Sequence, residues 1–322
     1  MRAVLIALTL ALASCATAAQ PLPVNVPASD GALAPNAELD GDVIALAFSG
    51  GGARAAAFSL GALQGLREMR APDGATLLSH VRLVTSVSGG SITAAYFSQH
   101  GEAGLDTFRT AYLDKDWARE LHTSPVSPLN WARLSGGGLN GPPLFADWLD
   151  REVFNHGLMR DVWNAHGVQV WLNATDLYNG TTFAFAPTYF QALCSDLGSV
   201  RVADAVASSM AFPLAFRPVL LAPYPAHCAP LPAWTADAGD HAAPALVRRT
   251  AQAFAAYRDP ARQPYLHLVD GGVLDNLGLT SLSLMRETAG NAYSPLSARD
   301  AVRVRRLTFL VINAEQTRRS TW

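Results

Sequence analysis

Short apolar runs alternate with glycine turns and longer amphipathic stretches along the chain. The apolar run at residues 43–48 is followed by three glycines and by a stretch with helical periodicity, AAAFSLGALQGLREM. A second run, Val81–Val87, is rich in β-branched residues and leads into a glycine turn and an expected helix at residues 91–99. Two strand–turn–helix units in series predict a mostly parallel sheet covered by helices, in the α/β class.

The second half of the chain continues this alternation. Helices are expected at residues 201–210 and 245–257, and strands at residues 168–174, 181–185, 265–269 and 307–312. Between the two halves, residues 121–143 are rich in Ser, Pro and Gly with scattered Trp and Leu, which is loop chemistry. This segment, taken as 121–145, is either a cap over a pocket or a plain surface excursion.

The N-terminus has the pattern of a targeting segment. Arg2 precedes an apolar run at residues 3–13 that is too short to span a bilayer and is typical of a signal-peptide core. The run ends in Leu12-Ala13-Ser14-Cys15, which resembles the bacterial lipobox, where cleavage before a cysteine accompanies its lipidation. We therefore expect a lipoprotein signal peptide at residues 1–14 and a lipidated Cys15 that anchors the protein to a membrane.

The residues after Cys15 bear on the protein's location. Ala16 follows the cysteine instead of Asp, which in lipoproteins points to the outer membrane of a bacterial cell envelope. The alternative is an ordinary secretory leader cut near Ala19, which would give a secreted or periplasmic protein. Residues 15–40 are rich in Pro, Ala and small polar residues and are predicted to form an extended tether before the folded domain.

Composition restricts the classes of function. Half of the 322 residues are hydrophobic and 16% are charged, which suits a sizeable core and one large α/β domain or two small ones. The formal net charge of −2 argues against a nucleic-acid binder with a broad basic face. The three cysteines form no CxxC pair, so a thiolate zinc site is not expected. Cys194 and Cys228 form either a disulfide or two separate thiols. No acidic loop has EF-hand spacing, and we expect neither a metal nor a cofactor.

A candidate nucleophile, Ser88, lies in the turn between the second predicted strand and its helix. A sharp strand-to-helix turn exposes a serine hydroxyl above the sheet and aims a helix N-terminus at it. Such a nucleophile elbow needs small residues two positions to either side, here Ser86 and Gly90. The pattern departs from G-x-S-x-G at Ser86, but serine is still small. The alternative is a glycine turn with a purely structural serine.

Gly50, Gly51 and Gly52 follow the first predicted strand, and Arg54 comes shortly after them. Consecutive glycines let backbone N–H groups converge on one anionic point, which suits the oxyanion of a tetrahedral ester intermediate. The same segment fits the loose dinucleotide fingerprint G-x-G-x-x-A. That fingerprint requires an acidic residue at the end of the second strand, and this strand ends at Ser88, so nucleotide binding is disfavoured.

Asp270 precedes Gly271 and Gly272 at the end of a predicted strand. It could accept the serine proton directly, or it could only stabilise its own glycine turn. None of the eight histidines follows Asp270, as a Ser–Asp–His order would require. His267 lies in the strand itself, on the opposite face from Asp270 by two-residue alternation. A Ser88–Asp270 dyad without histidine is therefore the simplest predicted machinery.

Taken together and in this order, the glycine loop, the serine turn and the DGG sequence resemble the patatin-like phospholipase family. Two further stretches resemble the family's central strand and its helix with a proline loop: NATDL from Asn173 and ASSMAFP from Ala207. The sequence departs from the family pattern at Ser86 and at Ala55, where the family usually has Gly. The resemblance implies a three-layer α/β/α sandwich in a patatin-like hydrolase domain at residues 41–322.

The resemblance also implies roles and an activity. Ser88 would be the nucleophile and Asp270 the base, and the oxyanion hole would comprise Gly50, Gly51 and Gly52 with Arg54 beside it. The expected activity is that of a lipid acyl hydrolase of the phospholipase A, lysophospholipase or esterase type, with a lipid or another acyl ester as its substrate. The alternative is a lipid-binding or envelope-assembly protein on the same fold that does not turn over substrate.

Overall fold

The computed structural model describes residues 22–29, 33, 38–116, 119, 142–213, 215–238, 243–294 and 296–315. The predicted signal peptide, Cys15 and almost all of the loop segment at 121–143 lie outside these residues. Within the described ranges, no helix is both long and apolar enough to cross a membrane.

A central sheet of seven strands forms the middle layer. Its order is β5-β6-β3-β2-β1-β7, with β4 paired to β3 off this path. The strands are β1 (Gly41–Phe48), β2 (Val81–Val87), β3 (Gln169–Asp176), β4 (Thr181–Ala184), β5 (Val219–Leu221), β6 (Leu266–Asp270) and β7 (Val304–Ile312). Each strand predicted from an apolar run is present to within a few residues, and β5 was not anticipated.

The sheet is mixed, although the sequence had predicted a mostly parallel one. Strands β7, β1, β2 and β3 pair in parallel, whereas the β3–β4, β3–β6 and β5–β6 pairs are antiparallel. Strands β3 and β4 are joined by a short turn at residues 177–180, and a connection of that length can only join antiparallel neighbours. The parallel half contains the two strand–turn–helix units that were recognisable in the sequence.

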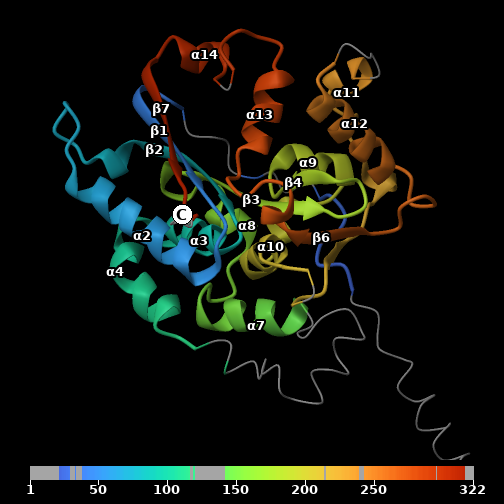
Figure 1. The fold of residues 1–322 in the computed structure, drawn as a ribbon. Helices are drawn as coiled ribbons and strands as arrows, with labels where there is room; N and C mark the ends of the chain where they lie inside the picture. The colour runs from blue at the N-terminus through green and yellow to red at the C-terminus, as the bar shows by residue number, and fades with distance from the viewer. Residues whose placement is uncertain are drawn as a thin grey trace, which may run out of the picture.

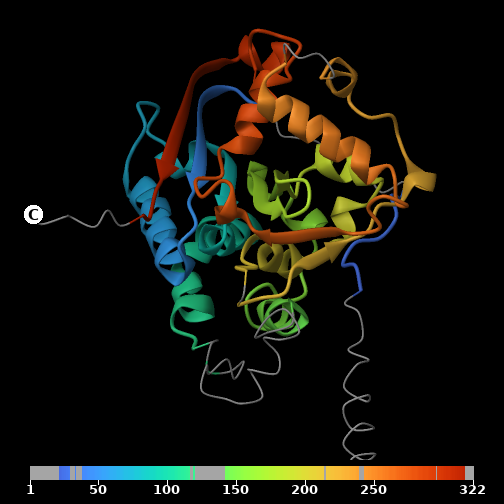
Figure 2. The ribbon, with the colours of Figure 1, turned by 45° about the vertical axis from the view of Figure 1, so that its right-hand side comes forward.

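Helices cover both faces of the sheet and complete the expected α/β/α sandwich (Figures 1 and 2). On one face, α3 and α10 contact the strands and α2 packs against α3; on the other, α12 and α13 contact β4 and α9 packs against α12. The α-helices are α2 (Gly52–Glu68), α3 (Gly89–His100), α4 (Gly104–Phe108), α7 (Pro142–Glu152), α8 (Met159–Val162), α9 (Pro187–Leu193), α10 (Val202–Ser209), α11 (Trp234–Asp237), α12 (Ala245–Tyr257), α13 (Thr280–Glu287) and α14 (Ala298–Ala301).

Short helical turns connect several of these elements. They are η1 (Leu77–His80), η2 (Gly101–Ala103), η3 (Arg109–Leu113), η4 (Ala165–Gly167), η5 (Leu197–Ser199), η6 (Pro225–His227) and η7 (Gly271–Val273). The last of these, η7, directly follows β6 and contains the two glycines of the DGG sequence.

The core is densely aromatic where β4 meets α9 and α12. Phe183 contacts Phe190 and Tyr257 with ring centroids 5.8 and 6.4 Å apart, and all three rings are buried. Burying each such ring contributes about 1.5–3 kcal/mol to folding. Beside this cluster Cys194 and Cys228 form a disulfide, with their Cα atoms 4.7 Å apart. The disulfide decides between the two alternatives that the sequence left open.

The described part of the predicted tether is bound to the domain. Residues 22–29 run along its surface, where Asn25 is buried and its side-chain amide donates to Ser195 Oγ and to the carbonyl oxygen of Ala222, each at 2.8 Å. The amide oxygen of Asn25 accepts a hydrogen bond from the Ala222 N–H, also at 2.8 Å. In a free tether these groups would form hydrogen bonds with water instead, so residues 22–29 are packed on the folded domain.

Candidate active site

Ser88 forms the sharp turn between β2 and α3. Its backbone has φ 51° and ψ −124°, a left-handed conformation that costs a non-glycine residue about 1–3 kcal/mol. The two following glycines are required by close packing: a Cβ on Gly89 would lie 1.9 Å from the carbonyl oxygen of Gly52, and one on Gly90 would lie 2.7 Å from that of Ser49. The turn therefore brings the starts of α2 and α3 together beside Ser88.

The side chains of Ser88 and Asp270 meet in the interior. Ser88 Oγ donates to Asp270 Oδ2 at 2.8 Å, and both residues are buried. The other carboxylate oxygen, Oδ1, accepts the N–H of Gly272 at 2.8 Å. A Cβ on Gly271 would lie 2.4 Å from the carbonyl oxygen of Asn173, so a side chain there would block the turn. Asp270 thus does both things that the sequence left open: it stabilises its own glycine turn and it reaches the serine.

Burial raises the pKa of the Asp270 carboxyl above its ordinary value, and the hydrogen bonds from Ser88 and Gly272 only partly oppose this. Within the described ranges no Lys, Arg or His forms an ion pair with Asp270. A carboxylate that is desolvated and lacks a cation binds a proton more readily than one in water, so it is a stronger base.

A group of buried hydroxyls beneath the turn was not recognised from the sequence. Ser209, the last residue of α10, accepts the Ser88 N–H at 2.8 Å and donates to the carbonyl oxygen of Asn173 at 2.6 Å. Its hydroxyl also lies 2.9 Å from Ser91 Oγ, which is 3.1 Å from Ser86 Oγ. Ser86 therefore has a hydrogen-bond partner where the usual pattern has glycine. The sequence held one signal for this group, the ASSMAFP stretch, but gave no role to its second serine.

The glycine loop lies against the serine. A Cβ on Gly50 would be 3.4 Å from Ser88 Cβ. The Gly50 N–H, however, donates to the carbonyl oxygen of Asn276 at 2.9 Å, so it is not free to bind an oxyanion as the sequence had predicted. Gly52 and Gly89 are the first residues of α2 and α3, where an α-helix leaves its N–H groups without an intrahelical partner. Two helix N-termini thus converge near Ser88.

Arg54 is exposed in the first turn of α2, and its Nη2 would lie 3.4 Å from a Cβ on Gly51. It therefore sits beside the glycine loop, as the sequence had predicted. His267 packs edge-on against Tyr178 with ring centroids 4.6 Å apart, and burial lowers the pKa of its imidazole. It makes no hydrogen bond to Ser88 or Asp270. In the part of the chain that the structure describes, no group of three or more His, Cys, Asp or Glu side chains could hold a metal ion.

Comparisons with known proteins identify the family of the chain. The family model described as "Patatin-like phospholipase" matches residues 46–283, most of the chain. Among solved structures the chain is similar to the crystal structure of VipD from Legionella pneumophila, with 14% identity and a TM-score of 0.34. That alignment covers 92% of this chain and 55% of the other, so the chain spans about half the length of VipD. A comparison with curated protein sequences finds no match.

Proposed function

The chain belongs to the patatin-like phospholipase family, and on that premise we propose that it is a serine-dependent lipid acyl hydrolase with a Ser88–Asp270 dyad. Phospholipase A, lysophospholipase and esterase activities all fall within this class. The observation that carries the proposal is the 2.8 Å hydrogen bond between Ser88 Oγ and Asp270 Oδ2, two side chains 182 residues apart in the sequence.

In the first half of the reaction, Ser88 Oγ attacks the carbonyl carbon of the ester while Asp270 takes the hydroxyl proton. The carbonyl oxygen becomes an oxyanion, which accepts hydrogen bonds from the N–H groups of Gly51, Gly52 and Gly89. Gly50 instead holds the loop in place through Asn276. The intermediate then expels the alcohol, which takes the proton from Asp270, and an acyl ester of Ser88 remains.

In the second half, water attacks the acyl ester while Asp270 takes one of its protons. A second oxyanion forms at the same N–H groups and collapses, releasing the fatty acid and returning the proton to Ser88. The raised pKa of Asp270 supports this role, because a base whose pKa lies nearer to the working pH transfers protons more effectively.

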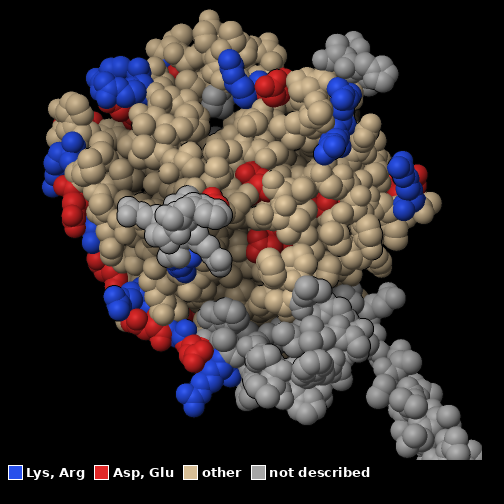
Figure 3. All heavy atoms as spheres, viewed as in Figure 1, with Lys and Arg blue, Asp and Glu red and all other residues tan. Residues whose placement is uncertain are grey.

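An apolar border next to Asp270 supports a lipid as the substrate. Phe212, Val273 and Leu274 are exposed, and the carbonyl oxygen of Ala211, just before Phe212, accepts the Asp270 N–H at 2.9 Å. Exposed apolar side chains that gather at one place commonly mark a binding surface. Figure 3 shows most Lys and Arg side chains of this face toward its edge, with a few Asp and Glu side chains near its middle, and in Figure 1 β6 lies near the middle of the same view. This surface suits an apolar acyl chain.

The location of the enzyme is a separate proposal. We propose that Cys15 carries the lipid anchor of a bacterial outer-membrane lipoprotein, which would keep the domain close to membrane lipid. A secreted or periplasmic protein is the alternative. The support is the Leu12-Ala13-Ser14-Cys15 sequence alone.

The dyad is tested by substitution and by active-site labelling. Ser88→Ala and Asp270→Asn should each abolish hydrolysis of a p-nitrophenyl acyl ester, and Ser88→Ala should also abolish labelling by a fluorophosphonate. Ser208→Ala is the matched control, because this buried serine next to Ser209 donates only within α10, to the Asp204 carbonyl oxygen. Retained hydrolysis in either dyad variant would refute the mechanism. An unlabelled, inactive wild-type protein would favour the lipid-binding or envelope-assembly alternative.

A further inference from the structure

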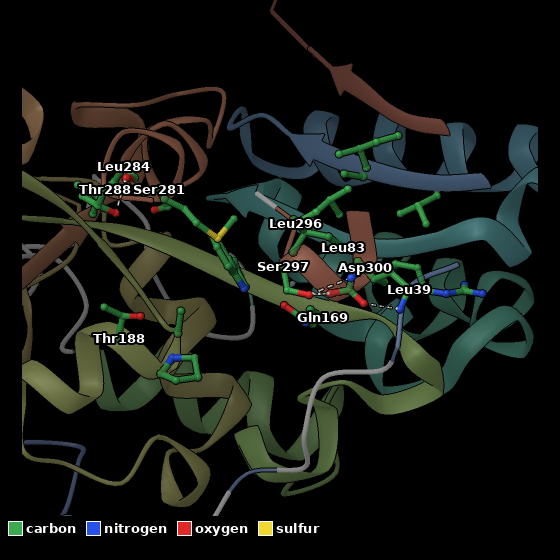
Figure 4. Close-up of a pocket in the computed structure, with 18 of the residues that line it drawn as sticks. Leu39, Leu83, Gln169, Thr188, Ser281, Leu284, Thr288, Leu296, Ser297 and Asp300 are labelled. Atoms are coloured by element: carbon green, nitrogen blue, oxygen red, sulfur yellow. Dashed lines mark hydrogen bonds between the residues drawn. The ribbon is translucent and has the colours of Figure 1, made fainter. Parts of the chain in front are cut away.

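A cavity lies on the other face of the sheet, between β1, β2, β3 and β7 and helices α9, α13 and α14 (Figure 4). Its volume is about 450 Å³, within the range of small-molecule sites. The floor is apolar and comes from four strands, with the side chains of Val43, Ala45, Leu83, Trp171, Leu307 and Phe309.

The cavity exists because this part of the sheet has little helical cover. Both faces of a sandwich sheet must be covered by apolar surface. Over the opposite face lies α2, with 17 residues, whereas α13 has eight residues and α14 has four. Phe309 and Val311 on the edge strand β7 are consequently 46% and 44% exposed. Helices therefore cover the apolar face of the sheet only partly at the cavity.

The cavity is separate from the Ser88 site. Its lining among the described residues includes neither Ser88 nor Asp270, and Leu83 lies five residues before Ser88, about 16 Å along the strand. Buried hydrogen bonds lie between the two: Asn173 Nδ2 donates to Thr85 Oγ1 at 2.8 Å, and Thr85 Oγ1 donates to the carbonyl oxygen of Gly278 at 2.8 Å. A ligand held in this cavity therefore cannot present its own ester to Ser88.

Most polar side chains of the lining gather at the ends of the cavity, and in the floor the buried Nε1–H of Trp171 has no hydrogen-bond partner among the described residues. At one end Figure 4 shows Gln169, Ser297 and Asp300, and at the other Thr188, Ser281 and Thr288. Asp300 already accepts hydrogen bonds from the Leu39 N–H and from Ser297 Oγ. Among the described lining residues the one cation is Arg82, which donates to the carbonyl oxygens of Ser79 and Val81. The middle of the cavity thus suits an uncharged chain and not a phosphate or a sugar.

We propose that this cavity binds a single acyl chain at a second lipid site, distinct from the site of hydrolysis. A volume of about 450 Å³ holds about fifteen groups the size of a water molecule or a methylene. The source of the chain rests on the proposed function: hydrolysis at Ser88 releases fatty acids, and the membrane supplies single-chain lipids that still carry a head group. The shared chemistry is one linear apolar chain with a polar end.

Binding is measured by calorimetry on the full chain carrying Ser88→Ala, which removes turnover. The probes are palmitate and monopalmitoylglycerol, each below its aggregation limit, so that the two arms distinguish a free product from an esterified lipid. Thr288→Trp in that background fills the cavity. Ser283→Trp is the matched control, because both hydroxyls donate to the carbonyl oxygen four residues earlier in the chain, yet Ser283 is exposed and does not line the cavity.

We expect saturable binding of at least one probe. Thr288→Trp should remove one bound equivalent of the probe or weaken its binding by about tenfold or more, which is the effect of losing about two methylene contacts. Ser283→Trp should bind the probe as the Ser88→Ala protein does. If Thr288→Trp does not fold, Phe309→Asp is tested instead, because a carboxylate in the exposed part of the apolar floor should weaken binding similarly. The proposal is overturned if neither probe binds, or if Thr288→Trp and Ser283→Trp bind the probes equally. It is also overturned if the protein forms a dimer that excludes both probes from the cavity.

A hydrolysis assay distinguishes failure of the second lipid site from failure of the hydrolase proposal. With Ser88 intact, Thr288→Trp should hydrolyse p-nitrophenyl butyrate as the wild type does. If neither protein hydrolyses the ester but the binding difference persists, the hydrolase proposal fails and the second lipid site stands. If both proteins hydrolyse the ester normally and no binding difference is found, the second lipid site fails and the hydrolase proposal stands.

Discussion

The substitution Ser209→Ala removes one hydroxyl and tests whether the hydrogen bonds of Ser209 keep the turn at Ser88 in place. Ser209 is fully buried and lies between two parts of the site. Its oxygen accepts the Ser88 N–H at 2.8 Å and its proton goes to the Asn173 carbonyl oxygen at 2.6 Å. Alanine would leave both backbone groups without this partner, in a place where water has little room to replace it.

The magnitude follows from those two groups. A buried donor or acceptor without a partner costs about 1–3 kcal/mol. Because the Ser91 hydroxyl, 2.9 Å from Ser209 Oγ, can turn toward one of the two groups, we expect a loss of about 2–4 kcal/mol in the free energy of unfolding. The loss also removes support for the left-handed Ser88 backbone. A shift of about 1 Å in a reacting atom can lower the rate about a hundredfold, so kcat should fall by about ten- to a hundredfold.

The assay separates positioning from general stability. Steady-state hydrolysis of a short p-nitrophenyl ester, well below the unfolding temperature, should show a lower kcat with KM nearly unchanged. Ser208→Ala, the neighbouring buried serine, is the control and should leave kcat as it is. Ser209→Thr keeps the hydroxyl and should recover part of the rate. If Ser209→Ala is less stable yet keeps its kcat, Ser209 does not position the nucleophile.

Three further predictions concern other parts of the chain. Asp270→Asn should be inactive but more stable than the wild type at neutral pH. Since burial raises the pKa of Asp270 above its unfolded value, its contribution to stability is present at low pH and is lost as the pH rises through the folded pKa. If the thermal unfolding temperatures of Asp270→Asn and the wild type do not converge as the pH falls, this explanation is wrong. In the wild type, kcat/KM should rise with pH through the same pKa. Gly89→Ala should prevent folding because its Cβ would meet the Gly52 carbonyl oxygen, whereas Gly65→Ala, with open space in α2, should add about 0.5–1 kcal/mol to the unfolding free energy. Cys15→Ser should move the protein from the membrane to the soluble fraction; unchanged membrane association would refute lipidation.

The local elements of the fold were predictable because each apolar run is bounded by glycine, proline or polar residues. The bounds of β2 (Val81–Val87) and α12 (Ala245–Tyr257) agree with the prediction to the residue. The candidate nucleophile was equally accessible, because the geometry of a strand-to-helix turn depends on a few adjacent residues. Gly89 and Gly90 could be anticipated from the sequence for that reason.

Features that depend on distant pairing were not predictable. The Gly50 N–H meets the carbonyl oxygen of Asn276 and the Ser88 N–H meets Ser209, across 226 and 121 residues respectively. No periodicity or local motif encodes such a meeting. The antiparallel direction of β6 has the same origin, since an apolar run of five residues carries no information about which neighbour it pairs with or in which direction.

That unpredicted direction of β6 determines how Ser88 and Asp270 meet. Val87 pairs with Asn173 in β3, which puts Ser88 level with Ala174, and the antiparallel register places Asp270 directly opposite Ala174. Two strand spacings then separate the backbones by about 10 Å, a gap that a serine, a hydrogen bond and an aspartate together can bridge. Residues opposite each other in an antiparallel pair point to the same face, so the side chain at position 174 projects beside that bridge. A shift of one residue would turn Asp270 to the other face. The dyad therefore requires both this register and a residue as small as alanine in the middle strand.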